Sequence, residues 1–168
     1  MAPTVKRILV PTDFSETADK ALVYAKDLAM KIGASLHLVH VFKDPYAVAA
    51  CAPEGYATVP AEMHERAIEE VRERLLERLD ADEEQQFRGS RGVVRGLVAP
   101  QIVDYAANQD IDLIVIGTHG RRGVAHLLLG SVAEHVVRTA ACPVLTVRAE
   151  HRKAEQQVEE AAATTAAA

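Results

Sequence analysis

The sequence predicts an α/β fold: a single-domain, doubly wound open sheet of five mostly parallel strands flanked by four helices. Apolar segments of strand length alternate with segments of helical periodicity along the chain, and that alternation favours parallel pairing. The strand segments are apolar at nearly every position, as in sheets covered on both faces. The chain has 168 residues, 49% of them apolar, which is enough for one domain with a sizeable core.

The first strand and helix are predicted by an apolar run followed by a capping signal. Val5–Pro11 is the strand, and Asp13 or Ser15 can cap a helix that extends to about Ile32. Gly33 then occupies the position where a left-handed residue commonly ends a helix. Apolar residues recur there with a period near 3.6 and define one face: Ala18, Ala21, Leu22, Ala25, Leu28, Ala29 and Ile32.

The second strand is predicted over Ser35–Phe42, which is again almost entirely apolar. Lys43–Pro60 follows as a loop with little pattern. A helix is predicted over Ala61–Leu79. Oppositely charged pairs on its outer side, such as Glu62–Arg66 and Glu70–Arg74, have the spacing that brings side chains together on a helix surface.

The third strand and third helix carry the weakest patterns. Gln86–Arg95 is predicted as an edge strand, because Gly89 and Gly92 interrupt it. Pro100 fits the first turn of a helix through about Asn108, since amides in that turn have no intrahelical acceptor.

The last elements complete an order that is typical of a Rossmann-like sheet. Asp112–Gly117 is predicted as the central strand, Ser131–Ala141 as the last helix and Pro143–Arg148 as the last strand. Residues 1–148 are assigned to this domain. Residues 149–168 are first charged and then rich in Ala and Thr, with almost nothing to bury, which indicates a frayed or disordered tail.

The segment from residue 111 to residue 147 joins a strand, a glycine-rich loop and a helix start, the order that builds an anion site from backbone groups. The first amides of a helix are unpaired and carry partial positive charge, and glycines let a phosphate approach. Ser131 and Glu134 have the spacing of a capping box at that helix start. Ligands of such sheets bind where the strand order reverses. We therefore expect the site at Pro11–Asp13 and Gly117–Ser131.

Charge and composition exclude several classes of function. The net charge of −5 and the absence of Trp argue against a general nucleic-acid binder. No signal peptide or membrane-length apolar run is visible, so we expect a cytoplasmic protein with reduced thiols at Cys51 and Cys142. Cys142 is interpreted as core filling. His37 and His40 lie three apart on a strand and point to opposite faces, so no metal site is predicted.

The glycine pattern is neither a phosphate-binding Walker loop nor the dinucleotide fingerprint. It reads G-x2-G-x9-G-[ST], formed by Gly117, Gly120, Gly130 and Ser131, and it resembles the nucleotide-binding signature of the universal stress protein family. The resemblance extends over about Lys6–Arg148. Its other segments are ILVPTDFSETADKAL, LHLVHV, DLIVIGTHGR and GSVAEHVVRTAACPVLTVR, all in the family's order.

The resemblance implies a nucleotide-binding protein. Members with this glycine pattern resemble the ATP-binding branch, and the family usually forms homodimers, often through the last strand, here Pro143–Arg148. The implied ligand is ATP, ADP or AMP, with Mg²⁺ carried by the nucleotide. Asp13 and Val41 would contact the adenosine part. The residues implied for the ribose and phosphate path are Gly117, Gly120, Gly130, Ser131 and Val132, and we add their neighbours Pro11, Thr12, Ile116, Thr118, His119 and Arg121.

Each candidate residue also has a purely structural interpretation. Gly117 and Gly120 can simply turn the chain after a strand. Asp13 and Ser131 can act only as helix caps, and Val41 can be ordinary core. The titratable His119 and the charged Arg121 are loop residues that can lie in solvent without a ligand.

Three functions remain open on the sequence. The first is a nucleotide-binding regulatory protein, because the loop has no evident catalytic set and no lysine. The second is a slow ATPase in which Asp13 or His119 assists water or metal. The third is a dimerising interaction module without nucleotide. An adenylating enzyme of related layout is more distant, because it needs a further substrate pocket for which the chain has little room.

Overall fold

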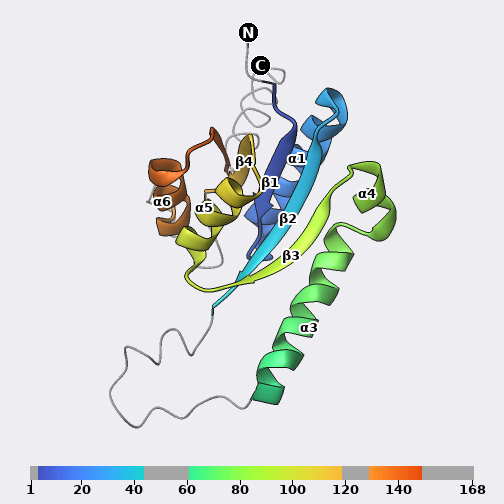
Figure 1. The fold of residues 1–168 in the computed structure, drawn as a ribbon, viewed down its shortest axis with the longest axis vertical. Coiled ribbons are helices and arrows are strands. Elements are labelled where there is room, and N and C mark those ends of the chain that lie inside the picture. The colour runs from blue at the N-terminus through green and yellow to red at the C-terminus, as the bar shows by residue number, and fades with distance from the viewer. Residues whose placement is uncertain (1–3, 44–60, 119–128, 149–168) are drawn as a thin grey trace, which may run out of the picture.

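The structure is a computed structural model that describes residues 4–43, 61–118 and 129–148. Five parallel strands form one sheet in the order β3-β2-β1-β4-β5 (Figure 1), which confirms the predicted fold class. The strands are β1 (Arg7–Pro11), β2 (Ser35–Phe42), β3 (Ser90–Arg95), β4 (Leu113–Gly117) and β5 (Val144–Val147). The predicted parallel pairing therefore holds for every strand pair of this sheet.

Helices cover both faces of the sheet. They are α1 (Glu16–Ile32), α3 (Ala61–Arg78), α4 (Ala81–Gln86), α5 (Val98–Asn108) and α6 (Ser131–Thr139). α1 and α3 pack on one face with one hydrophobic cluster, and α5 and α6 pack on the other face with a second cluster. The three inner strands β1, β2 and β4 contribute buried residues to both clusters, so they are buried from two sides.

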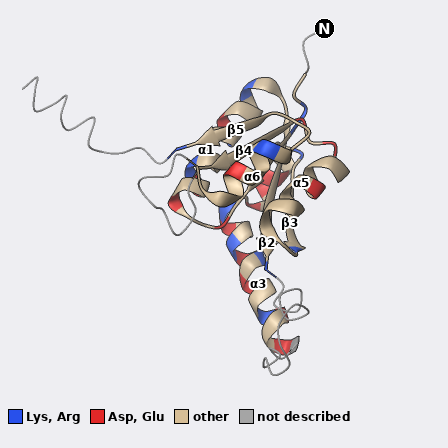
Figure 2. Cartoon of the chain, turned by 90° about the vertical axis from the view of Figure 1, so that its left-hand side faces the viewer, with Lys and Arg blue, Asp and Glu red and all other residues tan. Residues whose placement is uncertain are grey.

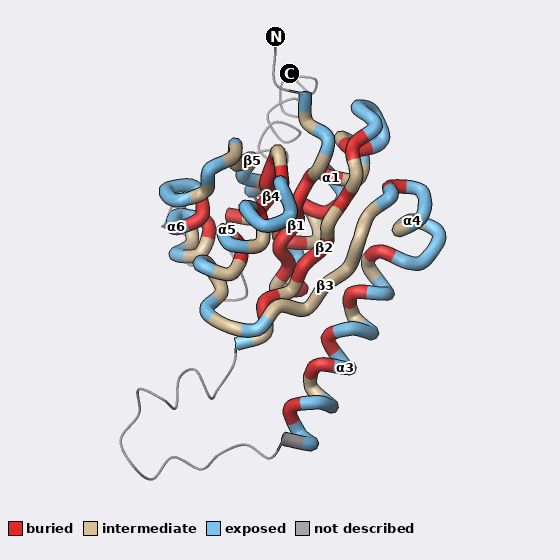
Figure 3. The backbone as a smooth tube through the Cα atoms, viewed as in Figure 1, coloured by how far each residue is buried: buried red, intermediate tan, exposed pale blue. Residues whose placement is uncertain are grey.

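The alternation of side chains along β1 explains why the strand segments read as continuous apolar runs. Ile8 and Val10 belong to the cluster under α1 and α3, while Leu9 between them belongs to the cluster under α5 and α6. All three are essentially inaccessible to solvent, and Figure 3 shows buried residues along the middle of the sheet. A strand with two buried faces needs apolar residues at both parities, which removes the period-2 signal.

Three details of the predicted fold are wrong. The central strand is β1, because the chain moves outward from it to β2 and β3 and then crosses to β4 and β5 on its other side. The described residues contain α4 in addition to the four predicted helices, and it includes Gln86, so β3 begins only at Ser90. Ile32 was expected in the core but is 46% exposed, because it is the last residue of α1.

The other boundaries agree with the predictions to within two residues, and β2 agrees at both ends. β3 is an edge strand, as expected. Arg74, which was expected to pair with Glu70, has its guanidinium over the ring of Phe14. From residue 44 onward the predicted loop to Pro60 lies outside the described residues, and so does the predicted tail. No helix among the described residues is long and apolar enough to span a bilayer.

His37 predicts a pH dependence of stability. Burial, together with repulsion from Arg7, lowers the pKa of His37 from its ordinary value of 6.5. The unfolded chain therefore takes up the proton first as pH falls, so the free energy of unfolding is fully present above pH 6.5 and decreases below it. In the folded protein Nδ1 of His37 lies 3.2 Å from the Tyr105 hydroxyl and 3.1 Å from the Ser90 hydroxyl.

The expected result is that the His37→Gln variant loses less stability than the parent between pH 7.5 and pH 5. Urea unfolding at both pH values measures the two free energies. An equal loss in parent and variant would assign the pH dependence to other groups.

Candidate functional site

The strand order reverses between β1 and β4, so the carboxyl ends of these two strands frame the position where ligands of open α/β sheets bind. The chain leaves β1 for α1 and leaves β4 toward α6. Pro11–Asp13 and Ile116–Thr118 therefore lie at the same edge of the sheet, as the sequence predicts. Backbone hydrogen bonds and close packing connect this edge to the starts of α1 and α6 and to the end of β2.

The turn between β1 and α1 is held by its own side chains. The Phe14 amide donates to the Thr12 hydroxyl at 3.0 Å, and the Ser15 amide donates to Oδ1 of Asp13 at 3.1 Å. Ser15 is the N-cap of α1, and its hydroxyl accepts from the Ala18 amide. The structural interpretation of Asp13 as the helix cap is therefore wrong. Asp13 instead accepts from the amide of the N-cap residue Ser15 and so stabilises the turn that precedes α1.

Phe14 has a φ of 63°, in the left-handed region that residues with a Cβ rarely occupy. Such a conformation costs about 1–3 kcal/mol and persists only where surrounding contacts impose it. The strained residue directly follows Asp13, so the conformation of Phe14 helps set the direction of the Asp13 carboxylate.

The end of β2 lies beside this turn. The Thr12 amide donates to the Val39 carbonyl at 2.8 Å, and the Thr12 carbonyl accepts from Nδ1 of His40 at 2.8 Å. β2 continues beyond Val39, its last partner on β1, and Val41 still pairs with Val94 of β3. The Val41 side chain is buried in the cluster under α5 and α6, so only its backbone is suited to a ligand.

The end of β4 packs tightly against the start of α1. A Cβ on Gly117 would lie 2.9 Å from Cγ2 of Thr17 and 3.1 Å from the Thr17 carbonyl carbon and oxygen. Gly117 thus has a packing role whether or not a ligand binds. Ile116 and Thr118 on either side are buried, and Thr118 is only 1% exposed.

Thr118 connects three elements through its backbone. Its amide donates to the Val147 carbonyl of β5 at 2.8 Å, and its carbonyl accepts from the Gly130 amide at 2.6 Å. The second bond fixes the start of α6 against the end of β4. Because it engages the Gly130 amide, an anion at this helix start would be held by the amides that follow.

The predicted capping box at α6 is wrong. Gly130, in an extended conformation with φ −70° and ψ 154°, is the N-cap, which makes Ser131 the first helical residue. Glu134 forms an ion pair with Arg138 at 2.7 Å. Among the described residues no side chain caps α6, whereas Ser15 caps α1 and Asp80 caps α4. The amides of the first turn, including those of Ser131 and Val132, have no intrahelical acceptor.

The described candidate residues therefore gather at one edge of the sheet, contributed by β1, β2, β4 and the start of α6. His119, Gly120 and Arg121 lie outside the described residues. Sequence reasoning missed His40, Phe14 and Thr17 as neighbours of the site. The sequence contained a signal for Phe14, because a large apolar residue between Asp13 and the N-cap Ser15 is expected to be buried.

The described part of the chain contains no group of three His, Cys, Asp or Glu side chains placed to hold a metal ion. Figure 2 shows that acidic and basic residues are interspersed along α3. Cys142 packs against the cluster under α5 and α6, and burial raises the pKa of its thiol, which disfavours the reactive thiolate. The residues that gather at the carboxyl edge instead offer backbone amides and one carboxylate. The backbone amides suit an anionic group, and the carboxylate suits a hydrogen-bond donor such as a hydroxyl.

Comparison with known proteins identifies the family. The model of the universal stress protein family matches residues 4–148. Universal stress protein MJ0531 of Methanocaldococcus jannaschii is 34% identical over 143 residues, which cover 85% of this chain and 82% of that protein.

Two solved structures extend the likeness. That of hypothetical protein MJ0577 of the same organism has a TM-score of 0.75 at 29% identity, covering 89% of this chain and 99% of that one. That of the universal stress protein from Archaeoglobus fulgidus in complex with dAMP has a TM-score of 0.59 at 25% identity, covering 86% and 99%. The match of the family model spans every described residue, and together with the relative at 34% identity it leads to one conclusion: this chain belongs to the universal stress protein family.

Proposed function

We propose that this protein is an adenine-nucleotide-binding regulatory protein that holds ATP at the carboxyl edge between β1 and β4, within the domain formed by residues 1–148. The observation that carries the proposal is the start of α6. It lies against the end of β4 through the bond between Gly130 and Thr118, at the strand-order reversal, and no described side chain caps it.

The phosphate end of a nucleotide fits this helix start. The first-turn amides at Ser131 and Val132 carry partial positive charge from the helix dipole. Gly130 adds no side chain in front of them. The protein's net charge is −5, so attraction of a phosphate relies on these local dipoles rather than on the overall field. ATP supplies its own Mg²⁺, which needs few protein ligands.

The nucleoside end fits the opposite side of the same edge. Asp13 can accept hydrogen bonds from ribose hydroxyls, and the backbone of β2 at Val41, beyond its pairing with β1, can pair with the edge of an adenine ring. The Archaeoglobus relative solved with dAMP supports an adenine nucleotide as the ligand class. The remaining proposed contacts are Pro11, Thr12, Ile116, Gly117, Thr118, His119, Gly120 and Arg121.

A regulatory role is favoured over catalysis. Phosphoryl transfer requires a group that positions the attacking water and cations that stabilise the developing charge. Among the described candidates Asp13 is the only carboxylate, and its Oδ1 accepts from the Ser15 amide. Nucleotide binding would instead shift the conformation of a surface through which the protein meets a partner.

The surface proposed for that role is a homodimer face at β5. β5 is the terminal strand of the sheet and pairs with β4 alone among the described strands. A second copy could extend the sheet through this edge, as exposed strand edges readily do. The strand end is also connected to the site, because Val147 accepts from the Thr118 amide.

The experiment is identification of the ligand carried by freshly purified protein. Mass spectrometry of the heat-released fraction should detect an adenine nucleotide, and incubation with ATP and Mg²⁺ should leave it intact. Turnover above that of the Asp13→Ala variant would instead establish a slow ATPase. An empty protein that also fails to bind added ATP would contradict the proposal and leave an interaction module.

A further inference from the structure

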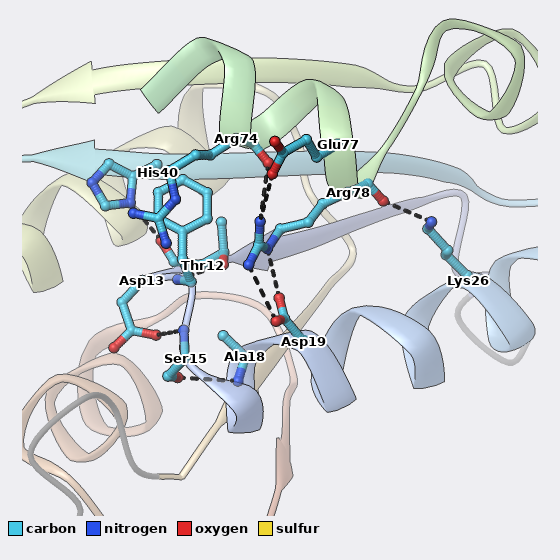
Figure 4. A network of polar contacts seen from close by, with 11 residues as sticks. Thr12, Asp13, Ser15, Ala18, Asp19, Lys26, His40, Arg74, Glu77 and Arg78 are labelled. Atoms are coloured by element: carbon cyan, nitrogen blue, oxygen red, sulfur yellow. Dashed lines mark hydrogen bonds and ion pairs between the residues drawn. The ribbon is translucent and has the colours of Figure 1, made fainter. Parts of the chain in front are cut away.

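α3 reaches the candidate site although none of its residues belongs to it. The Arg74 guanidinium carbon lies 3.9 Å from the centroid of the Phe14 ring, and that of Arg78 lies 4.9 Å from it. The His40 ring also stacks on Phe14, with centroids 4.7 Å apart and planes 22° from parallel. Figure 4 shows Arg74 and Arg78 extending from α3 toward the turn that carries Asp13 and Ser15.

These contacts help to hold the turn at Phe14 in its strained conformation. Phe14 is held at a positive φ, and an unfavourable backbone conformation persists only where surrounding contacts impose it. The contacts of the Phe14 ring act here together with the hydrogen bonds of the Phe14 and Ser15 amides. Phe14 is buried, and its ring contacts the His40 imidazole and two guanidinium groups, which a ring face attracts as cations. His40 also donates to the Thr12 carbonyl. The same side chain therefore contacts both the Phe14 ring and the backbone two residues before it.

The two arginines have different roles. Arg78 forms a two-point ion pair with Asp19 of α1, with Nε to Oδ1 at 2.7 Å and Nη2 to Oδ2 at 3.3 Å. Its carbonyl also accepts from Lys26 of α1 at 2.7 Å. Arg78 therefore fastens α3 to α1, whereas the Arg74 guanidinium lies over the Phe14 ring.

We propose that Arg74 and Phe14 are positioning residues for the nucleotide site. Through the Phe14 ring, α3 holds the β1–α1 turn in the conformation that directs Asp13 toward the nucleoside. Affinity for adenine nucleotide then depends on a helix that does not touch it, and any partner or modification that shifts α3 alters binding. This inference rests on the proposed function, because it concerns the same site.

The first test is the affinity of the Arg74→Met variant, which keeps a side chain of similar length but removes the cation. Calorimetry with ATP should give a dissociation constant about fivefold weaker than that of the parent. AMP should weaken by the same factor, because Asp13 is proposed to contact the nucleoside and not the phosphates. Arg74→Lys, which retains a cation, should recover most of the affinity.

The matched control is Arg72→Met. Arg72 is also on α3, but it is exposed and pairs with Glu69 at 2.9 Å, away from the turn. Its affinity for ATP should stay within twofold of the parent. A fully folded Arg74→Met protein with parental affinity for both nucleotides would overturn the proposal and leave the proposed function intact.

The second test needs no nucleotide. Hydrogen exchange at the Phe14 and Ser15 amides reports the turn directly, because these amides donate to Thr12 and Asp13. Both should exchange at least fivefold faster in Arg74→Met, while the Ala34 amide at the far end of α1 should not change. If the parent binds no ATP, the proposed function fails, and unchanged exchange at Phe14 and Ser15 would then overturn the positioning role separately.

Discussion

The Gly130→Val variant should bind ATP at least about a hundredfold more weakly than the parent, a loss of about 2.7 kcal/mol. Gly130 is the N-cap of α6, directly before the amides proposed to hold the phosphates. A branched side chain there would occupy the space through which a phosphate approaches. It would also leave the amides of Ser131 and Val132 without their anionic acceptor. Isothermal titration calorimetry measures the difference.

The fold should tolerate this change. Gly130 has φ −70° and ψ 154°, an extended conformation that β-branched residues readily adopt. Its bond to the Thr118 carbonyl uses only the backbone amide and is retained. The Ser131→Ala variant is the matched control, because it removes one hydroxyl without adding volume, and it should lose less than about tenfold. Affinity within twofold of the parent in folded Gly130→Val would exclude this helix start as the phosphate site.

The Gly89→Ala variant should lose about 3 kcal/mol of stability, which corresponds to a fall of about 6–12 °C in Tm. A Cβ on Gly89 would overlap the carbonyl oxygen of Leu36, a backbone atom of a fully buried residue in β2 that cannot move aside alone. The chain enters β3 through this glycine, so relief of the overlap would shift the edge strand. Urea unfolding followed by circular dichroism gives the free energy.

Gly92→Ala, within β3 itself, provides the comparison. A Cβ there would meet only Cγ2 of Val39, at 3.9 Å, an ordinary contact. Its stability should equal or exceed that of the parent, because alanine restricts the unfolded chain more than glycine does. Equal losses in the two variants would mean that glycine flexibility, rather than the approach of Leu36, is what β3 requires.

The same two glycines show why part of the fold escapes sequence reasoning. Both interrupt the apolar pattern predicted for the third strand, yet a Cβ would overlap backbone at Gly89 and make only an ordinary contact at Gly92. That difference is set by a strand some fifty residues earlier. α4 was missed because its six residues have no apolar period, although Asp80 and Glu83 form the capping box that signals its start. The doubly buried strands, by contrast, are predictable because burial on two faces demands apolar residues throughout.

The site was predictable to the extent that topology determines it. The reversal of strand order brings Asp13 and Gly117 to one edge from any sequence that forms this sheet. Local capping was harder: a Ser followed three residues later by Glu fits a capping box at Ser131, but the helix begins one position earlier than that motif requires. Arg74 could not be associated with Asp13 at all, because their connection through Phe14 exists only in the folded packing.

The most direct test of the central claim is a crystal structure of this protein grown with saturating ATP and Mg²⁺. The account predicts the phosphates at the first amides of α6, beside Ser131 and Val132, and the nucleoside against Asp13 and the end of β2. Nucleotide bound elsewhere, or a carboxyl edge between β1 and β4 that stays empty at saturating ATP, would contradict it.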